Sequence, residues 1–168
     1  MALVYIGIGS NIDKEYHVAN ALQDLDKRFD DCRVSPIFES AAVNCTGDNY
    51  YNLVMELTTS LSIHELMQCL KDLEIIHGRK ATDRRYAPRT LDLDLLLFDN
   101  IIQSAPPVLP RPEILYHAFV LWPLSELAPD LRHPVSGLSM AELWRDFDKS
   151  TQVLRLAEWQ WPKITELA

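Results

Sequence analysis

The segment RYAPRTLDLDLLLF, residues 85 to 98, decides the fold because two acidic side chains interrupt the most apolar run of the chain. Side chains alternate along a strand at ~3.3 Å per residue, so Asp92 and Asp94 share a face, with Cα atoms ~7 Å apart. Leu96 and Phe98 continue that face beyond the acids. The opposite, core-facing side carries Leu91, Leu93, Leu95 and Leu97. The pattern predicts a core strand with two carboxylates at the mouth of a buried surface.

The two carboxylates need compensation, because like charges ~7 Å apart repel by ~2 kcal/mol at an effective dielectric of ~20. A divalent cation held by both would supply it, and Mg²⁺ favours one or two carboxylates together with phosphate oxygens and water. The alternative is a half-exposed strand whose aspartates pair with neighbouring arginines. The strand alone leaves both interpretations open.

A basic segment directly before the strand favours the cation. The net charge of the chain is −8, yet five of its 16 lysines and arginines lie within residues 79–89, against the single acid Asp83. Arginines that only neutralised two aspartates would leave this surplus positive charge unexplained, whereas phosphate groups would absorb it. We therefore predict a nucleotide phosphoryl-transfer site.

The composition restricts the class of protein. A chain of 168 residues with 48% hydrophobic residues and no internal repeat suits a single globular domain over residues 1–168. The negative net charge argues against general attraction to nucleic acid or anionic lipid. No apolar run approaches the ~20 residues of a membrane span, and the apolar N-terminus has the pattern of a strand rather than a signal peptide. We expect a cytoplasmic protein.

Periodicity predicts the order of elements. Strands are expected near residues 4–10, 33–40, 52–60 and 91–98, and helices over 13–29 and 62–77. Ser62 and Glu65 form a capping box for the second helix, and Gly78 is its expected stop. The order β-α-β-β-α-β predicts an α+β sandwich of the ferredoxin-like type. A proline-rich connection, a short buried segment and a helix near 139–147 extend it at the C-terminus.

Other nucleotide and metal motifs are lacking. The GIGSN sequence at residues 7–11 lacks the third glycine of a dinucleotide fingerprint, and we interpret it as a tight strand exit. His64 and Glu65 lack the second histidine of a zinc protease helix. The three cysteines are an odd number without Cys-x-x-Cys spacing, so neither a disulfide framework nor a zinc site is expected.

These residues carry a resemblance to a known family. RYAPRTLDLDLLLF, the opening VYIGIGSN, Tyr50 to Asn52, LEIIHGR and FVLWPLSELAP resemble the 6-hydroxymethyl-7,8-dihydropterin pyrophosphokinases over residues 2 to 135. The resemblance implies a ferredoxin-like enzyme of folate biosynthesis. Such an enzyme transfers the β,γ-pyrophosphoryl group of ATP to the pterin hydroxymethyl oxygen, releases AMP and uses two Mg²⁺ ions. It also implies a monomer whose partners are pterin, ATP and a following folate-pathway enzyme.

The resemblance also implies roles for individual residues. Asp92 and Asp94 would hold both metal ions and, with Arg79 and Arg89, carry the catalysis. The nucleotide set is Glu74, Arg79, Arg84, Arg85, Arg89, Arg111 and His117. For the pterin, Asn52 would hydrogen-bond the ring, Ser40 would lie near its amide edge, and Tyr50 and Phe119 would stack on its faces. Val43 completes the pterin set.

Two departures from the family concern the ATP site. The family usually has His-Pro in the proline-rich connection and an arginine six residues later, whereas this chain has Arg111-Pro112 and His117. Arginine is permanently cationic while histidine is mostly neutral at neutral pH, so the geometry of the charge should differ. An active pyrophosphokinase and a divergent pterin- or nucleotide-binding paralogue with weak or no transfer remain the two hypotheses. An unrelated metal phosphohydrolase is a third, and it would release phosphate without any pterin.

Overall fold

The protein has an α+β fold, as the sequence predicts. The computed structural model describes residues 1–41, 48–78 and 90–161. In chain order, the elements are β1 (Ala2–Ser10), α1 (Lys14–Arg28), β2 (Asp30–Val34), β3 (Phe38–Ser40), β4 (Tyr50–Thr59), α2 (Ile63–Ile76), β5 (Asp92–Phe98), the 3-10 helix η1 (Pro112–Leu115), α3 (Ala118–Leu127), α4 (Met140–Arg145) and β6 (Leu154–Leu156). The C-terminal extension therefore consists of η1, α3, α4 and β6.

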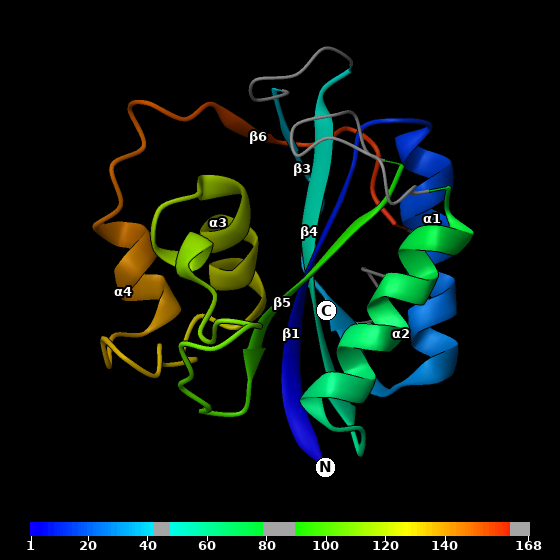
Figure 1. Ribbon diagram of the computed structural model, residues 1–168. Coiled ribbons are helices and arrows are strands. Elements are labelled where there is room, and N and C mark those ends of the chain that lie inside the picture. The colour runs from blue at the N-terminus through cyan, green and yellow to red at the C-terminus, as the bar shows by residue number, and fades with distance from the viewer. Residues whose placement is uncertain (42–47, 79–89, 162–168) are drawn as a thin grey trace.

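An antiparallel sheet separates two pairs of helices. Its order is β5-β1-β4-β3-β6, with β2 also paired to β4. Figure 1 shows α1 and α2 on one face of this sheet and α3 and α4 on the other. The expected single strand over residues 33–40 is wrong, because β2 ends at Val34 and β3 begins at Phe38. Pro36 lacks the N–H group that a strand pair needs for its backbone hydrogen bonds. Beside it, the Ser35 hydroxyl accepts the backbone N–H of Val54 at 2.9 Å.

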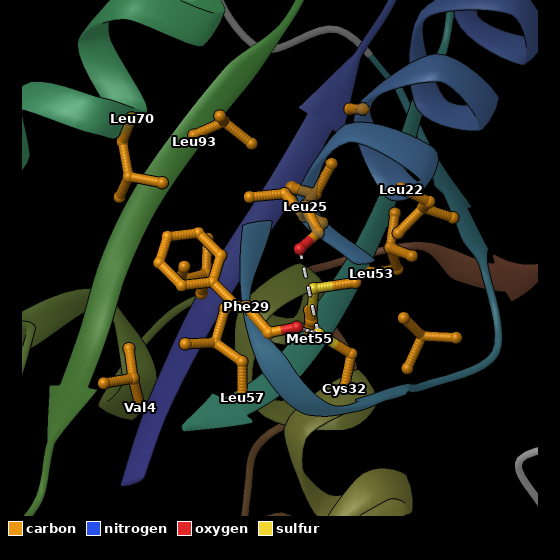
Figure 2. Close-up of a cluster of buried hydrophobic side chains, with 14 of the residues drawn as sticks. Val4, Leu22, Leu25, Phe29, Cys32, Leu53, Met55, Leu57, Leu70 and Leu93 are labelled. Carbon is orange, nitrogen blue, oxygen red and sulfur yellow. Dashed lines mark hydrogen bonds between the residues drawn. The ribbon is translucent and has the colours of Figure 1, made fainter. Parts of the chain in front are cut away.

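The larger core lies between the sheet and the first two helices. Leu22 and Leu25 of α1 and Leu70 of α2 gather around sheet residues such as Leu53 and Leu93 (Figure 2). All five side chains are buried, so each contributes about 1.5–3 kcal/mol through removal of apolar surface from water. On both helices, the buried residues recur at the 3.6-residue period of an amphipathic helix.

Helix α2 begins and ends where the sequence signals place its ends. Ser62 Oγ accepts the Glu65 N–H at 3.2 Å, and the Glu65 carboxylate accepts the Ser62 N–H at 3.0 Å. Gly78 has φ of +97°, the left-handed conformation that glycine adopts without strain, and its N–H donates to the Ile75 carbonyl. The capping box and the glycine stop are both confirmed.

The second core joins the opposite face of the sheet to the C-terminal extension. Val54 and Leu96 pack there with Leu121 and Leu124 of α3 and Met140 at the start of α4. The expected short buried segment is α3, and the expected helix near residues 139–147 is α4, which ends at Arg145. This packing sets α3 over β3 and β4.

Strand β5 contains a bulge that the alternation does not predict. Tyr5 of β1 pairs with Leu97, but its neighbour Ile6 pairs with Leu95, so Leu96 is an extra residue on β5. Leu96 and Leu97 both enter the second core, while Phe98 belongs to the first. The expected faces of Leu97 and Phe98 are therefore wrong, whereas the shared face of Asp92 and Asp94, ahead of the bulge, stands.

A partly exposed ion pair between Arg33 and Glu56 ties β1, β2 and β4 together at the end of the sheet away from the two aspartates. The Arg33 guanidinium donates to both oxygens of Glu56 at 3.0 Å, and the Tyr5 hydroxyl donates to Glu56 as well. Burial by itself would raise the pKa of Glu56, but the hydrogen bonds from Arg33 and Tyr5 hold it below its usual value. The network therefore stabilises the fold only while Glu56 is ionised.

Glu56→Gln is expected to lower the free energy of unfolding at pH 7 by about 1 kcal/mol, because it removes the carboxylate partner of the buried Tyr5 hydroxyl and of the Arg33 guanidinium, whose contribution solvent screens. A folded-state pKa below the unfolded value of about 4.3 gives stability that is present above that pH and is lost as the pH falls through the folded pKa. Urea unfolding should show the wild-type advantage at pH 7 and its decline as the pH falls below the unfolded value of about 4.3. An advantage that does not decline at all in acid would contradict this role.

The described helices include none long and apolar enough to cross a membrane. Cys32 is buried and lies near the Leu25 and Phe29 carbonyls (Figure 2), and Cys69 is half-buried. Both are free thiols, as the spacing predicts.

Candidate functional site

Three strands bring the predicted metal and pterin residues into one row. Gly9 of β1 is the direct partner of Asp92 on β5 and of Asn52 on β4. Directly opposite residues of an antiparallel pair share a face, so Asp92, Gly9 and Asn52 lie side by side on the face that α3 partly covers. Gly7 occupies the same position between Asp94 and Val54. The sheet thus carries the two carboxylates and the Asn52 amide, which the family resemblance assigns to the pterin, on one surface, separated by a single strand.

The strand between them has no side chains on this surface at the two critical positions. Gly7 and Gly9 lie inside β1, which ends at Ser10, so the expected strand exit at residues 7–11 is wrong. A Cβ atom on Gly9 would lie 3.3 Å from Asn52 Oδ1, closer than an ordinary contact. The absence of a Cβ atom at Gly9 therefore leaves room for the Asn52 and Tyr50 side chains to lie close to β1.

The pterin residues that belong to β3 and β4 are in contact. The Asn52 side chain is buried, and its amide Nδ2 donates to Ser40 Oγ at 2.8 Å. Ser40 is the direct partner of Tyr50 across the strand pair. Phe119 lies in the first turn of α3, on the same side of the sheet, and packs on the second core. Four predicted pterin residues thus converge on one face, and Val43 lies outside the described residues.

The two aspartates are half-buried and influence each other. Asp94 Oδ1 forms an ion pair with Arg111 Nη2 at 3.4 Å. Burial and the neighbouring Asp92 carboxylate raise the pKa of Asp94 to about 7, while the Arg111 guanidinium opposes this shift. Such a pair of carboxylates attracts a cation, because a positive ion between them removes the repulsion and restores the charged form.

Glu74 connects α2 to the carboxylate strand. Its side chain is buried, and its Oε2 accepts the backbone N–H of Leu93, the residue between the two aspartates, at 2.8 Å. Strand β5 is the last strand on its side of the sheet, so its outward N–H groups need partners from elsewhere. The contact gives the buried Glu74 carboxylate a hydrogen-bond partner and fixes the strand that presents Asp92 and Asp94.

The two residues exchanged relative to the family, Arg111 and His117, flank the 3-10 helix η1. The Arg111 backbone N–H donates to the Leu96 carbonyl at 2.9 Å, which holds the start of η1 against β5. His117 is the N-cap of α3, and its ring stacks on Phe119 with centroids 4.6 Å apart. Burial lowers the pKa of His117. The Glu113 carboxylate acts to raise this pKa, and the Arg111 charge acts to lower it further. Arg111 therefore carries the positive charge here, and His117 is neutral at pH 7.

Four predicted phosphate ligands cannot be placed. Arg79, Arg84, Arg85 and Arg89 lie outside the described residues, so the site as built here consists of the carboxylates, Glu74, Arg111 and the pterin face. Sequence reasoning missed Glu113, which binds Arg111, and the position of Gly7 and Gly9 between the carboxylate strand and β4. Glycines at alternate positions of a strand were the available signal, since they remove side chains from one face only.

The donors present suit Mg²⁺ better than zinc. Within the parts of the chain that the structure describes, no three histidine, cysteine or acidic residues converge as a metal site. Asp92 and Asp94 are half-buried oxygen ligands on one face of the sheet, and Mg²⁺ needs only one or two carboxylates when phosphate and water fill its other positions. The residues therefore fit a cation that arrives with a phosphate ligand.

Comparison with known proteins assigns this fold and site to a class. The family model described as 7,8-dihydro-6-hydroxymethylpterin-pyrophosphokinase (HPPK) matches residues 5–129, which include β1 from Tyr5 onward and all of β2 to β5 and α3. The protein is an ATP-dependent pyrophosphokinase, that is, a diphosphotransferase. It belongs to the HPPK family.

Individual relatives agree with the family. The chain is 33% identical over 138 residues to 2-amino-4-hydroxy-6-hydroxymethyldihydropteridine pyrophosphokinase of Aquifex aeolicus, covering 80% of this chain and 86% of that protein. It is 37% identical over 145 residues to the protein of the same name from Pseudomonas aeruginosa, covering 83% and 88%. It is also 32% identical over 135 residues to Folic acid synthesis protein FOL1 of Dictyostelium discoideum, covering 79% of this chain and 20% of that longer protein.

Proposed function

We propose that the protein catalyses Mg²⁺-dependent transfer of the β,γ-pyrophosphoryl group of ATP to 6-hydroxymethyl-7,8-dihydropterin, giving AMP, in folate biosynthesis. The observation that carries this proposal is the row of Asp92, Gly9 and Asn52. Adjacent strands are ~4.8 Å apart, so the metal carboxylate and the pterin amide lie ~10 Å apart on one face of the sheet. That spacing suits a metal-bound triphosphate meeting the hydroxymethyl group of a pterin held at Asn52.

The aspartates supply the metal half of the site. Asp92 and Asp94 would hold two Mg²⁺ ions, which neutralise the negative charge of the triphosphate and orient it. Glu74 keeps their strand in place through Leu93, close to the bound nucleotide. Because the metals belong to the triphosphate, the pterin half can bind without them.

The cationic side chains supply the contacts to the ATP phosphates. We place Arg79 and Arg89 on the transferred group, with Arg84, Arg85 and Arg111 on the remaining phosphates and His117 at the edge of the nucleotide site. Arginine forks match phosphate oxygens, and charge develops on those oxygens during transfer. Positioning and electrostatic stabilisation then account for the catalysis, with little covalent work for the protein.

The reaction itself balances as a single displacement. The pterin hydroxymethyl oxygen attacks the β-phosphorus of ATP and forms a new P–O bond. The bond from that phosphorus to the oxygen bridging it to the α-phosphorus breaks, and AMP leaves with the electron pair. The hydroxyl proton passes to solvent or to a phosphate oxygen.

The pterin half uses aromatic walls and a few polar contacts. Asn52 hydrogen-bonds the ring, and Ser40, which already accepts from Asn52, lies at its amide edge. Tyr50 and Phe119 stack on the two faces, and Val43 adds apolar contact. A flat heteroaromatic with fixed donors and acceptors requires this combination.

One observation favours the second hypothesis, a divergent paralogue that binds pterin or nucleotide without efficient transfer. Arg111 reaches Asp94 as an ion pair, so a permanent cation sits on a carboxylate that the metal needs. Metal and triphosphate together can displace this contact, since phosphate offers Arg111 a stronger partner. We therefore favour the active enzyme.

The discriminating experiment incubates purified protein with ATP, Mg²⁺ and 6-hydroxymethyl-7,8-dihydropterin and follows AMP. We expect AMP to form only when all three are present, and chelation of the metal by EDTA to stop it. Calorimetric pterin binding without AMP formation would establish the paralogue instead. Phosphate released from ATP without pterin would establish the phosphohydrolase.

The finer features of the proposal follow the family resemblance. We infer that β1-α1-β2/β3-β4-α2-β5 is a ferredoxin-like unit within a single domain, supported by the element order and by the central position of β1. A cytoplasmic monomer is proposed. The product is a pyrophosphate ester, whose good leaving group suits a following folate-pathway enzyme that displaces it.

A further inference from the structure

We propose that Glu113 is a positioning residue that holds the Arg111 guanidinium in the orientation that binds the nucleotide phosphates. This inference rests on the proposed function. In this proposal, Glu113 does not contact the substrate and acts only through Arg111.

The guanidinium of Arg111 is held on two sides. Its Nε donates to the Glu113 carboxylate, and its Nη2 lies 3.4 Å from Asp94 Oδ1. The side chains of Arg111 and Asp94 are 34% and 36% exposed, so this arrangement borders the open face of the site rather than the core. The backbone of Arg111 is fixed separately through Leu96.

Glu113 is itself fixed by its own 3-10 helix. The Tyr116 hydroxyl donates to Glu113 Oε1 at 2.9 Å, while Oε2 accepts from Arg111. The Glu113 carbonyl also accepts the backbone N–H of His117 at 2.9 Å. Both carboxylate oxygens thus have partners, and Glu113 is a rigid support instead of a mobile surface acid.

The geometry leaves one side of the guanidinium available. Without Glu113, an arginine near two aspartates would form a bidentate ion pair with one of the carboxylates, which is the geometry that a guanidinium prefers. Glu113 engages Nε, so Arg111 meets Asp94 only through Nη2. When a cation occupies Asp94, the Nη groups can pass to a phosphate oxygen while Glu113 keeps Nε in place.

A purely electrostatic role for Glu113 predicts the opposite outcome. A carboxylate near a triphosphate repels it, so its removal would then tighten nucleotide binding. A positioning role predicts weaker binding on removal. It also predicts that a neutral acceptor restores the affinity, because a glutamine oxygen can accept the Nε–H group of Arg111.

The test is calorimetric affinity for a nonhydrolysable ATP analogue with Mg²⁺. We expect Glu113→Ala to weaken binding about tenfold and Glu113→Gln to recover most of that loss. Arg111→Ala should weaken binding at least as much, and the double variant Arg111→Ala, Glu113→Ala should equal Arg111→Ala alone. Glu56→Gln, which breaks a different Arg–Glu pair, should lower stability but leave the affinity unchanged.

Three results overturn the proposal. These are tighter or unchanged binding in Glu113→Ala, equal effects of the alanine and glutamine variants, or additive losses in the double variant. If the wild-type protein forms AMP and any of these three results is obtained, only this inference is overturned and the proposed function stands. A wild-type protein that forms no AMP and does not bind the analogue overturns the proposed function and this inference with it.

Discussion

Replacement of Asp92 or Asp94 by asparagine is expected to lower AMP formation by on the order of a thousandfold, with pterin affinity changed by less than about threefold. Each variant keeps the volume of the side chain and removes one negative charge from the paired carboxylates. Because the proposed metals belong to the triphosphate, catalysis and nucleotide affinity should fall together. Pterin binding uses Asn52 and the aromatic residues across β1, so it should persist.

The measurement is AMP release alongside calorimetric titration with 6-hydroxymethyl-7,8-dihydropterin alone. Asp130→Asn, a change at an exposed aspartate beyond α3, is the matched control and should behave as wild type. Loss of pterin binding in Asp92→Asn or Asp94→Asn would count against the separation of the two halves. Near-normal AMP formation would remove the metal role from these residues.

Gly9→Ala is expected to lower kcat/KM for the pterin by about tenfold, because it requires a shift of a few tenths of an ångström in a site where a misplacement of about 1 Å costs roughly a hundredfold. The added methyl group would lie 3.3 Å from Asn52 Oδ1, so Asn52 must move and its bond to Ser40 is disturbed. It would also stand on the sheet surface between Asn52 and Asp92, where the hydroxymethyl group approaches the phosphate.

Gly7→Ala provides the matched control on the same strand and face. A Cβ atom there would lie 3.5 Å from Leu96 Cδ2, an ordinary van der Waals contact, so the effect on kcat/KM should stay within about threefold. Steady-state kinetics and thermal unfolding of both variants separate loss of function from loss of stability. Equal effects of the two substitutions would show that the surface at Gly9 has no special role.

Local periodicity accounts for most of what the sequence predicts correctly about the fold. Val18, Leu22 and Leu25 recur at helical spacing and lie buried in α1, and the capping box of α2 is a contact between residues three apart. The bulge at Leu96 depends on how β5 pairs with β1, which lies far away in the sequence. Local alternation therefore placed Leu97 and Phe98 on the wrong faces.

The candidate site divides in the same way. The shared face of Asp92 and Asp94 follows from strand geometry alone. Their position beside Gly9 and Asn52 follows from the register of three strands, which single-strand patterns do not contain. Glu113 gave no signal because its importance comes from one contact to Arg111 in a 3-10 helix that has no periodic pattern.

The most direct test of the proposed transfer is the identity of both products in a single turnover, with enzyme in excess over pterin and with Mg²⁺ and ATP labelled at the β-phosphorus. We predict that the label appears on the pterin, which gains two phosphoryl groups, and that AMP appears in equal amount. ADP with a singly phosphorylated pterin, or labelled products without modified pterin, would contradict pyrophosphoryl transfer.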